Sequence, residues 1–211
     1  MSDLRITSPM KPGESVRPQP KARFTVGLDL GQAQDYSALS VVQHVGREYH
    51  VRDLRRWQLG TRYPDVVTDV AELVRTRVLQ GPRLVVDATG VGRPVVEMFE
   101  DAGLHPYAVW ITGGDKVQRD GTEYRVPKRE LASTLQALLQ SGRLKFARGL
   151  RHGDTLRREM QHFKVKVNLA TGHDSYEHWR EGDHDDLVLS LAMACWMGEH
   201  GRSGKSASMA L

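Results

Sequence analysis

Four aspartates stand where a carboxylate can take part in chemistry. Asp29 interrupts the apolar run FTVGLDLG, Asp87 ends the apolar run LVVD, and Asp185 and Asp186 open the helical pattern DDLVLSLAMA. A charge inside an apolar strand is costly unless it is paired or bound to a cation. In open α/β sheets, ligands bind beyond the carboxyl ends of the strands. We therefore expect three separate elements to bring these carboxylates to one site.

Such a cluster favours metal-dependent cleavage of a phosphodiester. Carboxylates without histidine or thiol ligands prefer the hard cations Mg²⁺ and Mn²⁺. Two such ions about 4 Å apart activate a water and stabilise the leaving oxygen. Structural explanations stay open, because Asp185 and Asp186 suit the first turn of a helix and Asp87 suits a turn or cap. Asp29, in the middle of a strand, has no capping role.

The elements that must position these aspartates alternate between strands and helices. Short apolar or alternating runs predict strands at 24–30, 37–45, 48–57, 83–87, 106–111, 144–146, 164–169 and 176–179. Apolar residues at helical spacing predict helices at 64–79, 94–102, 128–140, 155–163 and 185–197. Three consecutive strands followed by alternating helices and strands indicate an α/β domain with a mixed β-sheet flanked by helices.

Composition divides the chain into one domain and two tails. A length of 211 residues suits a single domain. Residues 1–23 hold four prolines and few large apolar groups, so we expect them to be disordered. Residues 24–197 are expected to form the domain, and residues 198–211 a flexible tail.

The net charge of +4 conceals an uneven distribution. Residues 24–197 are neutral overall, but residues 119–166 within them carry a net charge of +7. A neutral domain divided into basic and acidic zones suits a protein that holds a polyanion beside a cluster of carboxylates. Solvated helix faces that happen to be basic are the alternative explanation.

Several classes of protein are excluded by what the sequence lacks. No apolar run approaches the roughly 18 residues that span a bilayer, and the N-terminus has no apolar segment of a secretory signal. Cys195 is the single cysteine and cannot form an internal disulfide, so we expect a cytoplasmic protein with no membrane partner. Gly204–Ser206 resembles the end of a phosphate-binding P-loop, but Glu199 stands where that motif needs glycine. The nine histidines do not assemble a tetrahedral zinc set with Cys195.

Four strings, in this order and spacing, carry a resemblance to a known family: GLDLGQAQDYSALSVV, LVVDATGVGRPVVEMF, VPKRELASTLQALLQSGRLKF and HDDLVLSLAMACW. They resemble the C-terminal nuclease domain of phage terminase large subunits. That domain has a ribonuclease H-like fold and is similar to Holliday-junction resolvases. The resemblance covers roughly residues 24–197, and the second and fourth strings are its most specific parts.

The resemblance implies a set of site residues. Asp29, Asp87 and Asp186 would be the catalytic, metal-binding carboxylates, with Asp185 adjacent as a further ligand of two Mg²⁺ or Mn²⁺ ions. Asp35 would be an auxiliary acidic residue. His184, directly before the paired aspartates, is a candidate for orienting a ligand or water, and packing beside a helix cap is the alternative. Basic residues expected to contact DNA phosphates are Arg125, Lys128, Arg129, Arg143 and Lys145.

The function implied is a metal-dependent DNA endonuclease that cleaves double-stranded DNA during viral DNA packaging. The chain has no Walker A sequence, so the packaging ATPase would be a separate partner, together with a small terminase subunit and a portal, in the cytoplasm of the host cell. Two alternatives stay open. One is a fragment of an actin-like or sugar-kinase-like ATPase, with phosphate loops at 27–31 and 87–92. The other is a catalytically silent DNA-binding module of the packaging assembly.

Overall fold

One sheet organises the molecule. The computed structural model describes residues 23–32, 35–79, 81–169 and 184–203, which hold eight strands and five helices. In chain order they are β1 (Arg23–Asp29), β2 (Ala38–Val45), β3 (Glu48–Arg56), α1 (Tyr63–Val74), β4 (Arg83–Asp87), α2 (Arg93–Asp101), β5 (Tyr107–Thr112), β6 (Gln118–Asp120), β7 (Glu123–Pro127), α3 (Lys128–Gln140), β8 (Leu144–Phe146), α4 (Gly153–Leu169) and α5 (Asp186–Ser203).

The sheet is mixed, in the order β6-β7-β5-β4-β1-β2-β3-β8. The strands β1, β2 and β3 form an antiparallel meander, while β4, β5 and β7 extend the sheet from β1 in parallel. Because β1 and β4 run in the same direction, their carboxyl ends meet at one edge of the sheet, where ligands are expected in α/β proteins. The predicted α/β class with a mixed sheet flanked by helices is confirmed.

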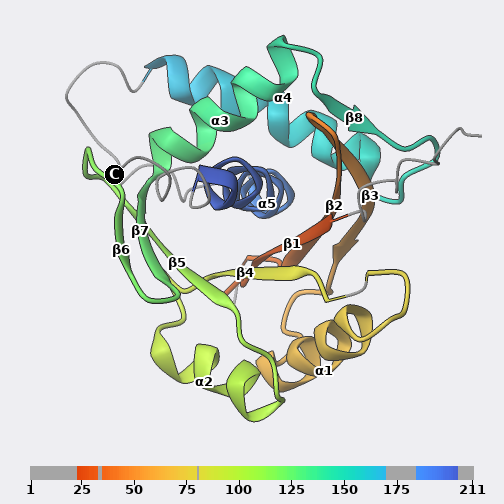
Figure 1. Ribbon diagram of the computed structural model, residues 1–211, viewed down its shortest axis with the longest axis vertical. Coiled ribbons are helices and arrows are strands. Elements are labelled where there is room, and N and C mark those ends of the chain that lie inside the picture. Colours follow the sequence, from red (N-terminus) through yellow and green to blue (C-terminus); the bar gives the residue numbers. More distant parts are fainter. Residues whose placement is uncertain (1–22, 33–34, 80, 170–183, 204–211) are drawn as a thin grey trace, which may run out of the picture.

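Helices cover both faces of the sheet (Figure 1). The helices α1 and α2 lie on one face, over a core that includes Val26, Leu28 and Val86. On the other face α5 lies against the sheet, and α3 and α4 cover α5 in turn. Side chains alternate between the two faces along a strand, so the residues next to Leu28 and Val86 face α5.

The helix α5 is buried on all sides along most of its length, from Asp186 to Met197. A helix that is apolar all round belongs inside a protein, and this one passes through the middle of the larger core (Figure 1). Gly27 of β1 permits its close approach, because a Cβ there would lie 2.0 Å from the backbone oxygen of Ser190. The hydroxyls of Ser40 and Ser190 share a buried hydrogen bond of 2.7 Å between β2 and α5.

The structure differs from the sequence predictions in four places. The helix predicted at 64–79 is α1, which ends at Val74. Residues 164–169 belong to α4 and not to a strand. The strand prediction was wrong because the four residues KVKV are too few to distinguish the two-residue period of a strand from the 3.6-residue period of a helix. The sequence did not predict the hairpin β6–β7, in which Gly121, with a φ of 57°, is the first residue of the two-residue loop between Asp120 and Glu123. The helix α5 continues to Ser203 rather than ending at Met197. The strand predicted at 176–179 lies outside the described residues.

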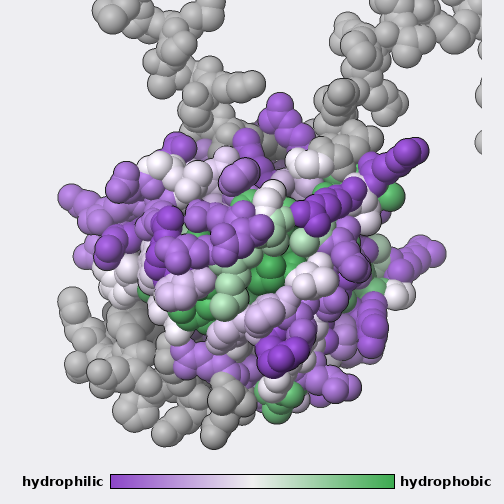
Figure 2. All heavy atoms as spheres, turned by 90° about the horizontal axis from the view of Figure 1, so that it is seen from below, coloured by the Kyte–Doolittle hydropathy of each residue, from purple (hydrophilic) through white to green (hydrophobic). Residues whose placement is uncertain are grey.

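The surface is predominantly hydrophilic on the side of α1 and α2. Figure 2 views the molecule from below, where hydrophilic residues surround a small hydrophobic area. None of the helices in the described part of the chain is long and apolar enough to cross a membrane. The predicted domain limits at residues 24 and 197 stay predictions.

Candidate active site

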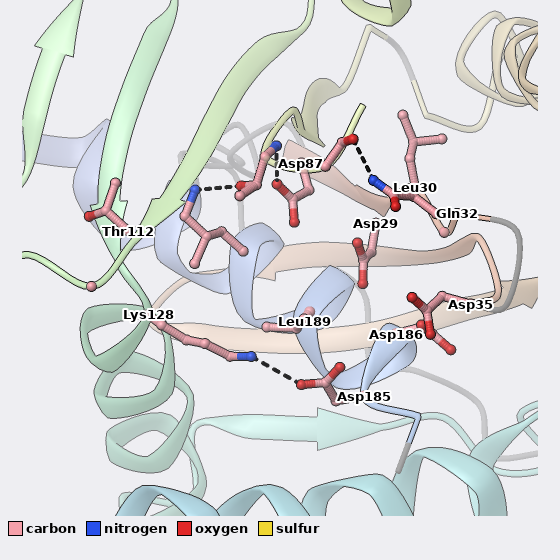
Figure 3. Close-up of a pocket in the computed structure, with 15 residues that line it drawn as sticks. Asp29, Leu30, Gln32, Asp35, Asp87, Thr112, Lys128, Asp185, Asp186 and Leu189 are labelled. Atoms are coloured by element: carbon pink, nitrogen blue, oxygen red, sulfur yellow. Dashed lines mark hydrogen bonds and ion pairs between the residues drawn. The ribbon is translucent and has the colours of Figure 1, made fainter. Parts of the chain in front are cut away.

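Two of the predicted aspartates come together at the carboxyl ends of β1 and β4. The parallel register pairs Leu28 with Val86, so the next residues along the two strands are Asp29 and Asp87. Both follow a residue that faces α1 and α2, and therefore both point to the side of the sheet where α5 lies. Figure 3 shows the two carboxylates side by side in the cleft.

The N-terminus of α5 supplies the other two. Asp186 is the first residue of the helix and Asp185 precedes it, and both line the same cleft as Asp29 and Asp87 (Figure 3). Asp35, in the turn after β1, lines it as well. The structure thus gathers all five predicted aspartates beyond the carboxyl ends of β1 and β4.

Turns after β1 and β4 form one wall of this cleft. The Gln32 side chain donates a hydrogen bond to the carbonyl of Gly90, which joins the two turns. The Asp87 carboxylate accepts a hydrogen bond of 2.8 Å from the backbone N–H of Thr89, and the Thr89 hydroxyl accepts one of 2.7 Å from Ile111. These bonds account for the turn role that the sequence allowed for Asp87, while leaving its carboxylate in the wall of the cleft.

Burial and mutual repulsion make the carboxylates hard to ionise. Burial, followed by the charges of Asp87, Asp186 and Asp185, raises the pKa of Asp29 well above its usual range, against a smaller opposing effect of Lys128. Burial also raises the pKa of Asp186 to about 7, although the neighbouring Arg56 opposes this shift. Crowded, buried carboxylates of this kind are stabilised by a cation placed between them.

The donor set fits a hard divalent cation. Asp29, Asp87, Asp185 and Asp186 offer oxygen ligands, which Mg²⁺ and Mn²⁺ prefer. On the outer side, one ligand atom each of Asp35, His184 and Asp186 lie within 4.8 Å of one another. The candidate role of His184 beside the aspartates therefore has a geometric basis, since its Nδ1 lies 3.8 Å from Oδ2 of Asp186.

Two basic side chains, from different elements, contact the adjacent aspartates Asp185 and Asp186. Lys128, the first residue of α3, places its Nζ 3.2 Å from Oδ2 of Asp185 (Figure 3). Arg56, at the end of β3, places its Nη2 3.2 Å from Oδ2 of Asp186. Sequence reasoning identified Lys128 but missed Arg56. The only local signal for Arg56 is its place at the end of an alternating strand, because its partner lies 130 residues away.

The predicted DNA-binding residues fall into two groups. Arg125 is exposed on β7 in a hollow that it shares with Thr112, and Thr112 also lines the acidic cleft. Arg129 pairs with Asp115 at 2.7 Å on the same side. Arg143 and Lys145 lie around β8, at the opposite edge of the sheet from β6 and β7. Of the five residues, only Lys128 lines the acidic cleft. Arg125 and the Asp115 partner of Arg129 line the neighbouring hollow, which meets the cleft at Thr112, and Arg143 and Lys145 lie away from both.

The glycines that suggested phosphate loops have other roles here. Gly27 is the point where α5 packs onto β1. A Cβ on Gly31 would lie 2.2 Å from the backbone oxygen of Asp35, so this glycine serves a tight turn. These close contacts account for Gly27 and Gly31 without a role in binding a nucleotide. They therefore weaken the interpretation of the chain as a kinase-like ATPase fragment.

Comparisons with known proteins identify the family and the fold. A family model described as the terminase RNase H-like domain matches residues 26–197. The large terminase nuclease from thermophilic phage G20c is 23% identical, over 83% of this chain and 82% of that one, with a TM-score of 0.56. The Thermus phage P74-26 large terminase nuclease domain is 22% identical, over 82% and 78%, with a TM-score of 0.53. No curated protein sequence matches the chain.

A more distant solved structure shares the same architecture. The human cytomegalovirus terminase nuclease domain, soaked with Mn, is 12% identical over 83% of each chain, with a TM-score of 0.52. Similarity at these identities shows a common fold, and the predicted ribonuclease H-like class is confirmed. Because the family model spans most of the sequence, the chain belongs to the family of terminase RNase H-like domains.

Proposed function

We propose that this protein is a metal-dependent endonuclease that cleaves double-stranded DNA during viral genome packaging. The observation that carries the proposal is the convergence of Asp29, Asp87 and Asp186 from two parallel strands and one helix end. A magnesium-bound form of the phage G20c nuclease and the Mn-soaked cytomegalovirus domain share this fold, which supports the choice of ion.

The proposed ligands are the buried carboxylates. Asp29, Asp87 and Asp186 would hold two Mg²⁺ or Mn²⁺ ions, with Asp185 as a further ligand and with Asp35 and His184 at the outer side. When bound, such ions lower the pKa of a water and neutralise charge on the leaving oxygen. Asp29 and Asp186 are buried, so their side chains would lose little conformational freedom when they bind the ions.

The basic residues beside the cleft would hold the DNA backbone. Lys128 of α3 lines the acidic cleft, Arg129 follows it on α3, and Arg125 of β7 lines the hollow that meets the cleft at Thr112. Phosphate contacts of this kind contribute affinity without reading sequence, so cleavage is expected to depend weakly on base sequence. In a packaging assembly, a separate ATPase motor, a small terminase subunit and a portal would be the further partners.

The test is Mn²⁺-dependent nicking of a supercoiled plasmid by wild type and by Asp87→Asn. The variant keeps the shape of the side chain and removes one ligand charge. Replacing a group that merely supports a metal ligand costs about 10–100-fold, so losing a ligand should lower the rate by at least about 100-fold. DNA binding should persist or tighten, because a negative charge near the phosphates is removed.

The matched control is Asp69→Asn on α1. Asp69 undergoes the same chemical change, but it lies on the other face of the sheet and accepts a hydrogen bond from Trp57. This variant should nick at the wild-type rate. Equal rates for wild type and Asp87→Asn would overturn the nuclease proposal, and DNA binding without nicking by the wild type would favour a silent packaging module.

A further inference from the structure

Arg56 lies behind the candidate metal ligand Asp186. Its Nη2 contacts Oδ2 of Asp186 at 3.2 Å, and its side chain is 14% exposed. Arg56 is not among the residues that line the cleft. A guanidinium in this place therefore acts on substrate only through the carboxylate that it contacts.

Glu159 of α4 holds the other side of the same guanidinium. Its Oε1 lies 3.9 Å from Nη1 of Arg56, and its Oε2 accepts a buried hydrogen bond of 3.0 Å from the backbone N–H of Val188. Val188 lies in the first turn of α5, where backbone N–H groups have no partner within the helix. Glu159 thus places its charge beside Arg56 and binds the helix end from which Asp186 projects.

Tyr36 completes the enclosure from the turn before β2. The guanidinium carbon of Arg56 lies 3.6 Å from the centroid of the Tyr36 ring, a stacked cation–π contact. The ring in turn meets His184 edge to face, with centroids 4.9 Å apart. Three elements therefore hold the planar group of Arg56 in one orientation.

This arrangement is poorly explained by stability alone. Within the described part of the chain, Nε of Arg56 and Oε1 of Glu159 are buried without a hydrogen-bond partner. A buried ion pair with incomplete hydrogen bonding contributes little net stability, because desolvation offsets the attraction. Unsatisfied buried groups of this kind call for another role.

We propose that Arg56, anchored by Glu159 and Tyr36, is a positioning residue that holds the Asp186 carboxylate in its cation-binding orientation. The inference rests on the proposed metal site. A ligand ordered before the ion arrives loses less conformational freedom on binding. Once the ion is bound, it orders the carboxylate itself. The effect of Arg56 should therefore appear in metal affinity and not in the rate at saturating metal.

The experiment is calorimetric titration of the full chain with Mn²⁺ alone, with no DNA present. We compare wild type, Arg56→Gln, Arg56→Lys and the control Arg55→Gln. Arg55 is the neighbouring residue, half-buried and paired with Asp53 at 3.0 Å. Arg56→Gln should weaken Mn²⁺ binding about tenfold, which corresponds to about 1.4 kcal/mol. Nicking at saturating Mn²⁺ should stay within about threefold of wild type, and Arg55→Gln should match wild type in both measurements.

Arg56→Lys keeps the charge but loses the planar fork, so it should weaken Mn²⁺ binding about threefold. This variant also keeps the test decisive if Arg56→Gln does not fold. Unchanged or tighter Mn²⁺ binding in the folded variants would overturn the inference, since Arg56 would then act as a structural group or as a competing charge. A wild type that binds no Mn²⁺ would instead overturn the proposed function.

Discussion

The two ends of α5 hold carboxylates in opposite circumstances. Near the C-terminal end, Glu199 accepts hydrogen bonds from two nitrogens of Arg143, at 2.6 and 3.3 Å, and from the hydroxyl of Tyr49. At the N-terminal end, Asp186 shares the cleft with four other aspartates, and its pKa is raised to about 7, chiefly by burial, despite its contact with Arg56. Both carboxylates contact an arginine, but Glu199 lies outside the acidic cleft, whereas Asp186 lies among four more aspartates.

This difference separates a structural carboxylate from a functional one. A paired carboxylate stabilises the position of the elements that it joins, here the end of α5 and the strands around Tyr49. Crowded carboxylates without enough cations destabilise the fold, and proteins retain such groups where function requires them. The comparison therefore supports a site at the N-terminal end that is completed by a divalent cation.

The largest expected effect is on the pH dependence of stability without metal. The pKa values of Asp29, Asp186 and Glu159 are all raised by burial, so the folded state binds more protons than the unfolded state at neutral pH. Stability should therefore fall as pH rises from about 5 to 7, by up to about 1.4 kcal/mol per pH unit for each carboxyl. Urea unfolding in the presence of a chelator measures this slope.

Variants at the two ends of the helix sharpen the result. Asp29→Asn should reduce the slope and make the metal-free protein more stable than wild type at neutral pH. Glu199→Gln should lower stability by only about 1 kcal/mol, because its ion pair with Arg143 is partly exposed. The slope should remain, because it arises from the buried carboxyls at the other end of α5. Stability that rises with pH over this range, in wild type, would contradict the contrast between the two ends.

A smaller effect is expected on DNA binding. Lys128 lines the acidic cleft and Arg125 lines the hollow that meets it at Thr112, whereas Lys145 lies on β8, the strand at the far side of the sheet, near Glu48. The variant with both Arg125→Gln and Lys128→Gln should bind duplex DNA more weakly. Each phosphate that the protein no longer neutralises should reduce the slope of log K against log salt by about 0.9. Lys145→Gln should change this slope little.

Fluorescence anisotropy of labelled duplex DNA across a salt series measures these slopes. Every protein in the series carries Asp87→Asn, so that the DNA is not cleaved when Mg²⁺ is present. If Lys145→Gln reduced the slope as much as the cleft variant does, the DNA would have to extend over β8. The proposed path of the backbone along β7 and α3 would then be wrong.

Local pattern was enough to predict the main elements and the aspartates of the cleft. Asp29 and Asp87 interrupt or end short apolar strands, and the apolar helix after Asp186 has an unmistakable length and composition. Parallel pairing of β1 and β4 then places the two strand aspartates together. Each of these inferences depends on the spacing of apolar residues and on where an apolar run ends, and both can be read from a single sequence.

The residues that support the site carry no such signal. Arg56 contacts Asp186, which lies 130 residues later in the sequence, and Glu159 contacts Val188, which lies 29 residues later. An arginine that ends a strand and a glutamate within a basic helix are ordinary on the surface, and only the packing of α4 against α5 buries them. The basic residues near β8 were grouped with the DNA contacts for the same reason, since sequence proximity does not show which edge of the sheet they reach.

The most direct test is a crystal structure of the protein grown with Mn²⁺, with anomalous scattering recorded to locate the ions. We expect two Mn²⁺ peaks between the carboxylates of Asp29, Asp87 and Asp186, about 4 Å apart. A crystal that holds Mn²⁺ elsewhere on the protein, while these carboxylates bind none, would contradict the account.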